Sequence, residues 1–541
     1  MSCYFIAVGG TGNKILESMV YAACAGVLRD AAGAPLSRLD ALTVDVDTAC
    51  GNTTRAGQAA ELYERVRGAM AGAPGRGFGT ELALDRWSMD LTRRAASVSG
   101  MTRNHRQDQL LARALFSRTE AELDYGEGFR GHPDLGVLFF SDMLSALDDN
   151  AAAGQPDEMN RLLSRMEDDL SRGETVRVLL AGSIFGGTGA SGIPVLSQFL
   201  RRRFAARSDR FVLGAILMLP YYAVPDSGRD EREELVVKSS AFLDKAKTAL
   251  HYYGMEGMIR SGEDDAKGVY DALYLLGLPR EAFVTARLYS TGSQSQENDA
   301  HMLEWLASRC AGTFYRTGFR GESSANIRCY YYQWHARTFS WDAFDEESDR
   351  FRMGYGGLLK AAAAFFAECY PTLRARIRED ARGRANLANY YAAFFSRVRH
   401  GGASSRARLE KNVDALYRLL AFYVHWMAQL LRTLPEGLRG ADTDSGVPEN
   451  ELLDARLLGE LCELLTLYGD ENRDRARMAA LRQSVCERVS RAVKRRVPDR
   501  VGMPKITAAL GGGKPLGKGP DAAFAGFWAT LLAAVLEEEG A

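Results

Sequence analysis

Residues 3–14 read CYFIAVGGTGNK and change character half-way along. The first six residues are apolar, which is typical of a strand buried on both faces of a parallel sheet. After Asn13, apolar residues recur at helical spacing, beginning with Ile15, Leu16 and Met19. This stretch therefore predicts a strand, a glycine turn and a helix, which together open an α/β domain.

Residues 176–192, VRVLLAGSIFGGTGASG, have the same order of apolar run, glycine turn and helical pattern. Further strands are expected at 39–46, 135–140, 211–219 and 270–276, and further helices near 57–71, 106–123, 157–172, 193–206, 230–253 and 296–315. This alternation predicts a doubly wound, mostly parallel sheet with helices on its faces.

The pattern changes near residue 350. Long helical patterns without a convincing strand cover 355–380, 385–399, 406–433, 449–468 and 473–496. We therefore predict an α/β domain with a central helix over 1–320, a connecting loop over 321–350, and an all-helical C-terminal domain over 351–541.

Composition excludes several classes of protein. The 541 residues include 68 basic and 69 acidic side chains, a formal net charge of −1 that gives no general attraction to nucleic acid. Eight cysteines occur without a CxxC pair, which argues against a zinc ribbon. The N-terminus lacks the features of a signal peptide, and no run of 18 apolar residues predicts a membrane span. We expect a cytoplasmic location.

The two glycine loops are the strongest candidate binding site. Their residues are Gly9, Gly10, Thr11, Gly12 and Asn13 in the first loop, and Gly186, Gly187, Thr188, Gly189, Ala190 and Ser191 in the second. A glycine loop that opens a helix brings backbone N–H groups and the positive end of the helix dipole close to an anion. Two loops are explained by one polyphosphate held from both sides. The alternatives are two tight turns, or a dinucleotide site with Asp45 on the ribose.

The second loop, GGTGAS, resembles the tubulin signature loop, and Val8–Asn13 is similar to the first phosphate loop of FtsZ and tubulin. The central helical pattern at 296–315, with His301, is similar to helix seven of tubulin. The resemblance covers roughly 1–345 and is closest to the divergent bacterial tubulin-like proteins. It implies a tubulin/FtsZ-type domain that binds GTP or GDP, with ATP not excluded, together with Mg²⁺.

The same resemblance assigns further residues. Asp45 and Asp47 follow the second expected strand and would hold the Mg²⁺, although a solvated loop edge explains them too. Arg103 or Arg106 would contact the γ-phosphate, with a solvated helix start as the alternative. Asn298 is the candidate for base contact; because Ala300 stands where tubulin has its asparagine, guanine specificity is open.

Hydrolysis is expected to depend on Asp342 and Asp345, which keep the DxxD part of the acidic FtsZ motif. A carboxylate from a neighbouring subunit can orient the attacking water, although a solvated acidic helix start, favoured by the helix dipole, explains these residues better. The resemblance thus implies a GTPase switch or a self-assembling subunit. The helical pattern after residue 350 does not resemble the family's α/β C-terminal domain, so a homo-oligomer or filament is a hypothesis that the resemblance does not carry. The C-terminal helices are candidates for contact with a partner protein. The alternatives are a non-catalytic scaffold or complex subunit, and a dinucleotide-dependent oxidoreductase.

Overall fold

The structure is a computed structural model of the 541-residue chain. It describes residues 1–47, 50–70, 77–87, 97–103, 106–129, 131–152, 154–223, 241–256, 258, 268–285, 298–317, 328–331, 353–379, 394–395, 398, 402–433, 455–470, 474–496 and 502–536. All structural statements below refer to these residues.

Seven parallel strands form the main sheet, in the order β3-β2-β1-β4-β5-β7-β9. The strands are β1 (Ser2–Val8), β2 (Arg38–Val44), β3 (Glu81–Arg86), β4 (Val176–Ser183), β5 (Phe211–Met218), β7 (Ala272–Leu276) and β9 (Arg328–Tyr331). A separate two-stranded sheet pairs β6 (Tyr222–Ala223) with β8 (Val284–Thr285). Chain order reverses between β1 and β4, and the crevice at such a point is where doubly wound sheets bind ligands.

Strand β1 lies inside the sheet, between β2 and β4, and its side chains alternate between two apolar cores. Phe5 and Ala7 belong to one core, whereas Tyr4, Ile6 and Val8 belong to the other. Because successive side chains of a strand point to opposite faces, an apolar run such as CYFIAV requires a cover on both sides.

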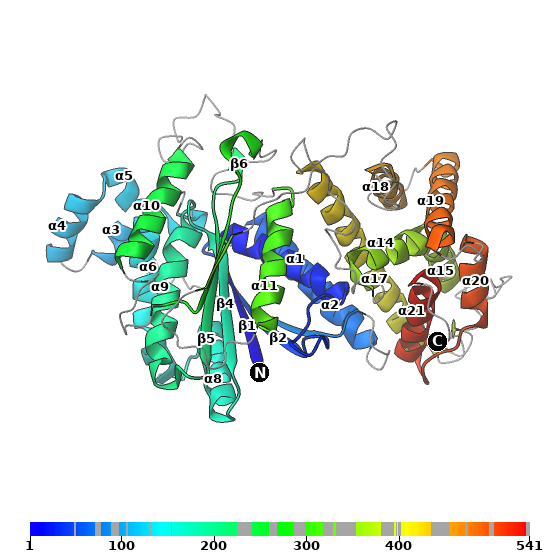
Figure 1. Ribbon diagram of the computed structural model, residues 1–541, viewed down its shortest axis with the longest axis horizontal. Helices are drawn as coiled ribbons and strands as arrows, with labels where there is room; N and C mark the ends of the chain where they lie inside the picture. Colours follow the sequence, from blue (N-terminus) through cyan, green and yellow to red (C-terminus); the bar gives the residue numbers. More distant parts are fainter. Residues whose placement is uncertain are drawn as a thin grey trace.

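Helices provide that cover on both faces (Figure 1). The first face carries α1 (Gly9–Cys24), α2 (Gly51–Ala69) and α11 (Met302–Arg316), and the second carries α6 (Pro133–Ser145), α8 (Glu158–Ser171), α9 (Thr188–Arg203) and α10 (Phe242–Met255). The short helices α3 (Val98–Met101), α4 (Arg106–Leu115), α5 (Arg118–Ala121) and α7 (Leu147–Ala152) complete the α/β part.

A helical layer packs outside the first face. It contains α14 (Gly354–Ala364), which continues through a π-helical turn into α15 (Tyr370–Glu379), and then α17 (Gly402–Arg432), α18 (Ala455–Gly469), α19 (Arg475–Arg496), α20 (Gly502–Gly512) and α21 (Pro520–Leu536). The ring of Trp426 on α17 lies 5.0 Å from that of Tyr21 on α1. The helical layer and the first face therefore share one continuous core.

The coarse prediction of an α/β part followed by a helical C-terminal region is confirmed. The strand predicted at 135–140 is wrong, because these residues lie in helix α6. Strand β3 was not predicted, and β9 falls within the segment predicted as a connecting loop. The helix predicted at 230–253 is described from Phe242 onward. No described helix has the length and apolarity needed to cross a membrane.

Candidate functional site

The two glycine loops lie side by side at the carboxyl edge of the sheet. Strands β1 and β4 are parallel neighbours, so that Ala7 pairs with Ala181 and the two following loops leave the sheet together. A Cβ atom placed on Gly9 would be 3.3 Å from Thr188 Cβ and 3.5 Å from the Gly189 amide nitrogen. Two segments nearly 180 residues apart in sequence thus form one surface, as the polyphosphate prediction requires.

Three of the glycines are required by backbone geometry, two by close contact and one by its φ angle. A Cβ on Gly12 would collide with the Ala181 carbonyl oxygen, and a Cβ on Gly189 with the Ser183 carbonyl oxygen. Gly9 adopts φ +71°, which side chains disfavour. The glycines therefore let the two helices begin directly against the strands.

Both helices begin without a side-chain cap. Neither Val8, which precedes α1, nor Gly187, which precedes α9, caps its helix with a side-chain hydrogen bond, and neither first turn contains an acidic residue. Uncapped N–H groups and the helix dipole attract anions, and here two such ends lie together. The Ser191 hydroxyl does not extend this donor set, because it donates to the Gly187 carbonyl at 2.8 Å.

Buried side chains link the first loop to the end of β2. Asn13 donates through Nδ2 to the Gly9 carbonyl at 3.1 Å and to Thr53 Oγ1 at 2.9 Å. The Thr53 hydroxyl in turn donates to Asp45 Oδ2 at 3.2 Å. Asn13 Oδ1 is buried and has no hydrogen-bond partner among the described residues. Thr53 lies eight residues after Asp45 in sequence, and no motif indicated it.

Asp45 is a carboxyl group held in an unfavourable environment for its charge. Burial, and after it the nearby carboxylate of Asp47, raises its pKa to about 7. A bound cation would offset both effects, as the predicted Mg²⁺ would. The described residues contain no cluster of three or more His, Cys, Asp and Glu side chains suited to a metal, but Mg²⁺ commonly uses one or two carboxylates, water and phosphate.

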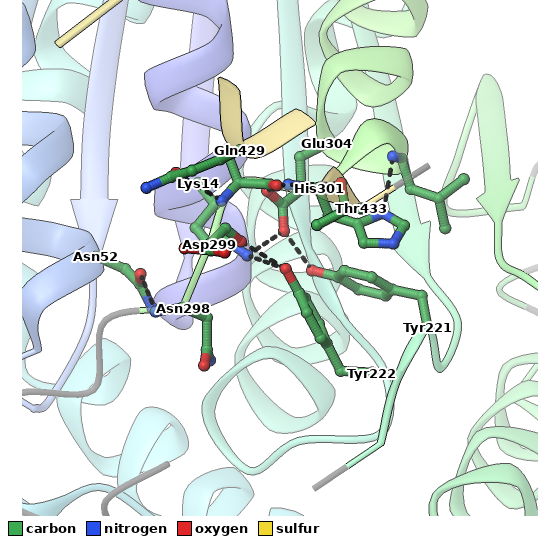
Figure 2. Close-up of polar contacts among 12 residues, drawn as sticks. Lys14, Asn52, Tyr221, Tyr222, Asn298, Asp299, His301, Glu304, Gln429 and Thr433 are labelled. Carbon is green, nitrogen blue, oxygen red and sulfur yellow. Dashed lines mark hydrogen bonds and ion pairs between the residues drawn. The ribbon is translucent and has the colours of Figure 1, made fainter. Parts of the chain in front are cut away.

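Figure 2 shows Asn298 beside Asn52, which lies at the start of α2. Its backbone N–H donates to Asn52 Oδ1 at 3.3 Å, and Asn52 Nδ2 would be 3.4 Å from a Cβ on Gly10. Asn298 Oδ1 is buried and has no partner within the described chain. Ala300 has a different neighbour: its N–H donates to Gln429 Oε1 of α17 at 2.8 Å.

A buried ionic cluster forms around Lys14, the residue that follows the first loop (Figure 2). Lys14 Nζ lies 2.5 Å from Glu304 Oε1, and Tyr221 donates to the same oxygen at 2.7 Å. Burial lowers the pKa of Lys14 and raises the pKa of Glu304. Because Lys14 directly follows the first loop, this ion pair ties the start of α1 to α11. The positive charge of Lys14 is compensated within this cluster by Glu304.

His301 caps the start of α11, where its Nδ1 accepts the Leu303 N–H at 3.1 Å. Its ring lies 4.8 Å from the ring of Tyr221, and Nε2 has no partner in the described part of the chain. Burial lowers the pKa of His301 well below its ordinary value, and Lys14 lowers it further. His301 is therefore a neutral helix cap.

Two other predicted residues, Arg103 and Arg106, are not brought to the loops. Arg103 and Arg106 are exposed near α3 and α4, and no described contact joins either to a glycine loop. Asp342 and Asp345 lie outside the described residues. Instead, a segment that sequence reasoning missed contacts the second loop: a Cβ on Gly187 would be 2.7 Å from Phe129 Cβ and 3.1 Å from the Gly131 nitrogen.

No family model matches this chain, and no curated protein is significantly similar to it.

Proposed function

We propose that this protein binds a nucleoside triphosphate, with its phosphates held between the two glycine loops. The observation that carries this proposal is the contact between Gly9 and Thr188, which places the uncapped starts of α1 and α9 together. Backbone amides of the first loop would hold the α- and β-phosphates, and those of the second the β- and γ-phosphates.

In this proposal Mg²⁺ supplies charge neutralisation when bound. Asp45 is the first candidate ligand, because its buried carboxyl group has a raised pKa that a cation would lower. Asp47 is the second, since its N–H donates to Asp45 Oδ1 at 3.3 Å and keeps the two residues together. Either carboxylate would bind the ion directly or through water.

The finer proposal is a tubulin/FtsZ-like GTP-binding protein. It rests on the resemblance of the two loops and on Asn298, whose backbone N–H donates to Asn52 and whose buried Oδ1 has no partner among the described residues. Hydrolysis by Asp342 and Asp345 of a neighbouring copy would make the protein a GTPase switch or a filament subunit. A non-catalytic scaffold that retains the nucleotide is the alternative.

A dinucleotide-dependent oxidoreductase is a competing proposal, since the strand order around β1 and β4 also suits a dinucleotide. Calorimetric titration with GTP, ATP, GDP and NAD⁺ in the presence of Mg²⁺ separates the two. We expect a purine triphosphate to bind below millimolar concentration and NAD⁺ not to compete with it. Failure of every triphosphate to bind would overturn the proposal, and tight NAD⁺ binding alone would favour the oxidoreductase.

Phosphate release then separates a GTPase from a scaffold. If the protein is a GTPase, Asp342→Ala/Asp345→Ala should still bind nucleotide and release phosphate far more slowly than the wild type. Equal rates would exclude these two carboxylates, and no release by the wild type would favour the scaffold.

A further inference from the structure

Helix α10 approaches the second glycine loop through its first turn. The ring of Phe242 packs 5.1 Å from that of Phe185, which lies directly before Gly186. One turn further along α10, the Lys245 ammonium donates a hydrogen bond to the Gly131 carbonyl oxygen. Gly131 is the residue whose amide nitrogen would be 3.1 Å from a Cβ on Gly187. Gly131 therefore lies between the Lys245 side chain and Gly187 of the second loop.

Lys245 differs from Lys14, the other lysine near the loops. Lys14 is fully buried and paired with Glu304, so its charge is already compensated. Lys245 is half-buried, and its described hydrogen-bond partner is a neutral carbonyl. Burial lowers the pKa of Lys245, and the carboxylate of Asp134 at the start of α6 opposes this effect. A partly desolvated ammonium held by a neutral acceptor gains free energy from a nearby anion.

A bound triphosphate would need a positively charged contact in addition to the two loops. Its donors at the two loops are backbone amides, which are neutral, whereas the terminal phosphate of a triphosphate is strongly anionic. A lysine side chain has a flexible four-carbon stem, so its ammonium can exchange a carbonyl acceptor for a phosphate oxygen without movement of the helix.

We propose that Lys245 is the cationic contact of the terminal phosphate in the second loop, and that it makes the site prefer a triphosphate over a diphosphate. This inference rests on the proposed nucleotide-binding function. It assigns to α10 the role that the sequence suggested for Arg103 or Arg106.

The test compares Lys245→Met with Lys247→Met in the full chain. Lys247 is a matched control, because it lies two residues further along α10, is exposed, and pairs at 3.6 Å with Asp244. Dissociation constants for GDP and for a non-hydrolysable GTP analogue are measured by calorimetric titration with Mg²⁺. Thermal unfolding of each variant confirms that it is folded.

We expect Lys245→Met to weaken binding of the triphosphate analogue about tenfold or more, the usual effect of losing one charged hydrogen bond, and to change GDP binding little. Lys245→Arg should recover part of the loss, and Lys247→Met should resemble the wild type. If the wild type binds both nucleotides and Lys245→Met leaves their ratio unchanged, the assignment of Lys245 is wrong. If the wild type binds neither these guanine nucleotides nor the corresponding adenine nucleotides, the proposed function fails with it.

Discussion

Asp45 shows how a single residue at this site can lower the stability of the unliganded protein. Its carboxyl group is buried beside Asp47, and its pKa is raised from 3.8 to about 7. The folded protein therefore binds this proton more tightly than the unfolded chain does. Between about pH 4 and pH 7 the free energy of unfolding should consequently fall as the pH rises, and above pH 7 the full cost should remain.

Replacement of Asp45 by Asn should remove this pH dependence. We expect Asp45→Asn to unfold at a higher urea concentration than the wild type above pH 7, by a few kcal/mol in free energy, and to lose this advantage near pH 4. Asp47→Asn should shift the wild-type transition in pH to lower values, because it removes the nearby negative charge. A difference between Asp45→Asn and wild type that does not vary with pH would contradict the raised pKa.

At the level of elements, periodicity predicted most of the sheet. The run at 3–8 is apolar at every position, and the run at 176–181 is apolar except for Arg177. Glycine follows both runs, so that strand, turn and helix could be assigned locally. Leu135–Phe140 misled the prediction because a short apolar run fits a buried helix as well as a strand. Pro133, at the first turn of α6, was the available helix signal.

The sequence predicted only the part of the site that has a local pattern. The glycine loops carry a local pattern, whereas the contribution of Thr53 and Asn52 depends on how α2 packs beside α1. Lys245 likewise reaches Gly131 only because α10 and the start of α6 lie together, across 114 residues of sequence. Such contacts leave no spacing signal in a single sequence.

At Gly12, the close packing of α1 against strands β1 and β4 leads to a prediction about stability. A Cβ on Gly12 would collide with backbone atoms of both Ala7 and Ala181, which cannot separate without disrupting the pairing of β1 with β4. Gly12→Ala should therefore lose about 1–3 kcal/mol of stability in urea denaturation. Gly57→Ala, in the interior of α2 with open space around it, should instead gain up to about 1 kcal/mol. Equal stability of the two variants would show that β1, α1 and β4 do not pack as described.

For the whole molecule, the main consequence is that the helical layer and the sheet share a core. Trp426 of α17 packs between the rings of Tyr21 on α1 and Tyr355 on α14. Gln429 and Thr433 bond the backbone of Ala300, two residues from Asn298 at the first loop. The two parts are therefore expected to unfold together, although the chain is long enough for independent domains.

Calorimetric unfolding tests this cooperation. We expect one thermal transition, which Trp426→Ala should lower as a whole by the equivalent of about 3–5 kcal/mol, because it leaves a large cavity in the shared core. Leu516→Ala, at an exposed position, should leave the transition nearly unchanged. Since a ligand that binds only the folded state stabilises every part that unfolds with its site, a triphosphate should raise this single transition temperature. Two transitions, with only the later one shifted by nucleotide and only the other lowered by Trp426→Ala, would instead show that the helical layer unfolds independently of the glycine loops.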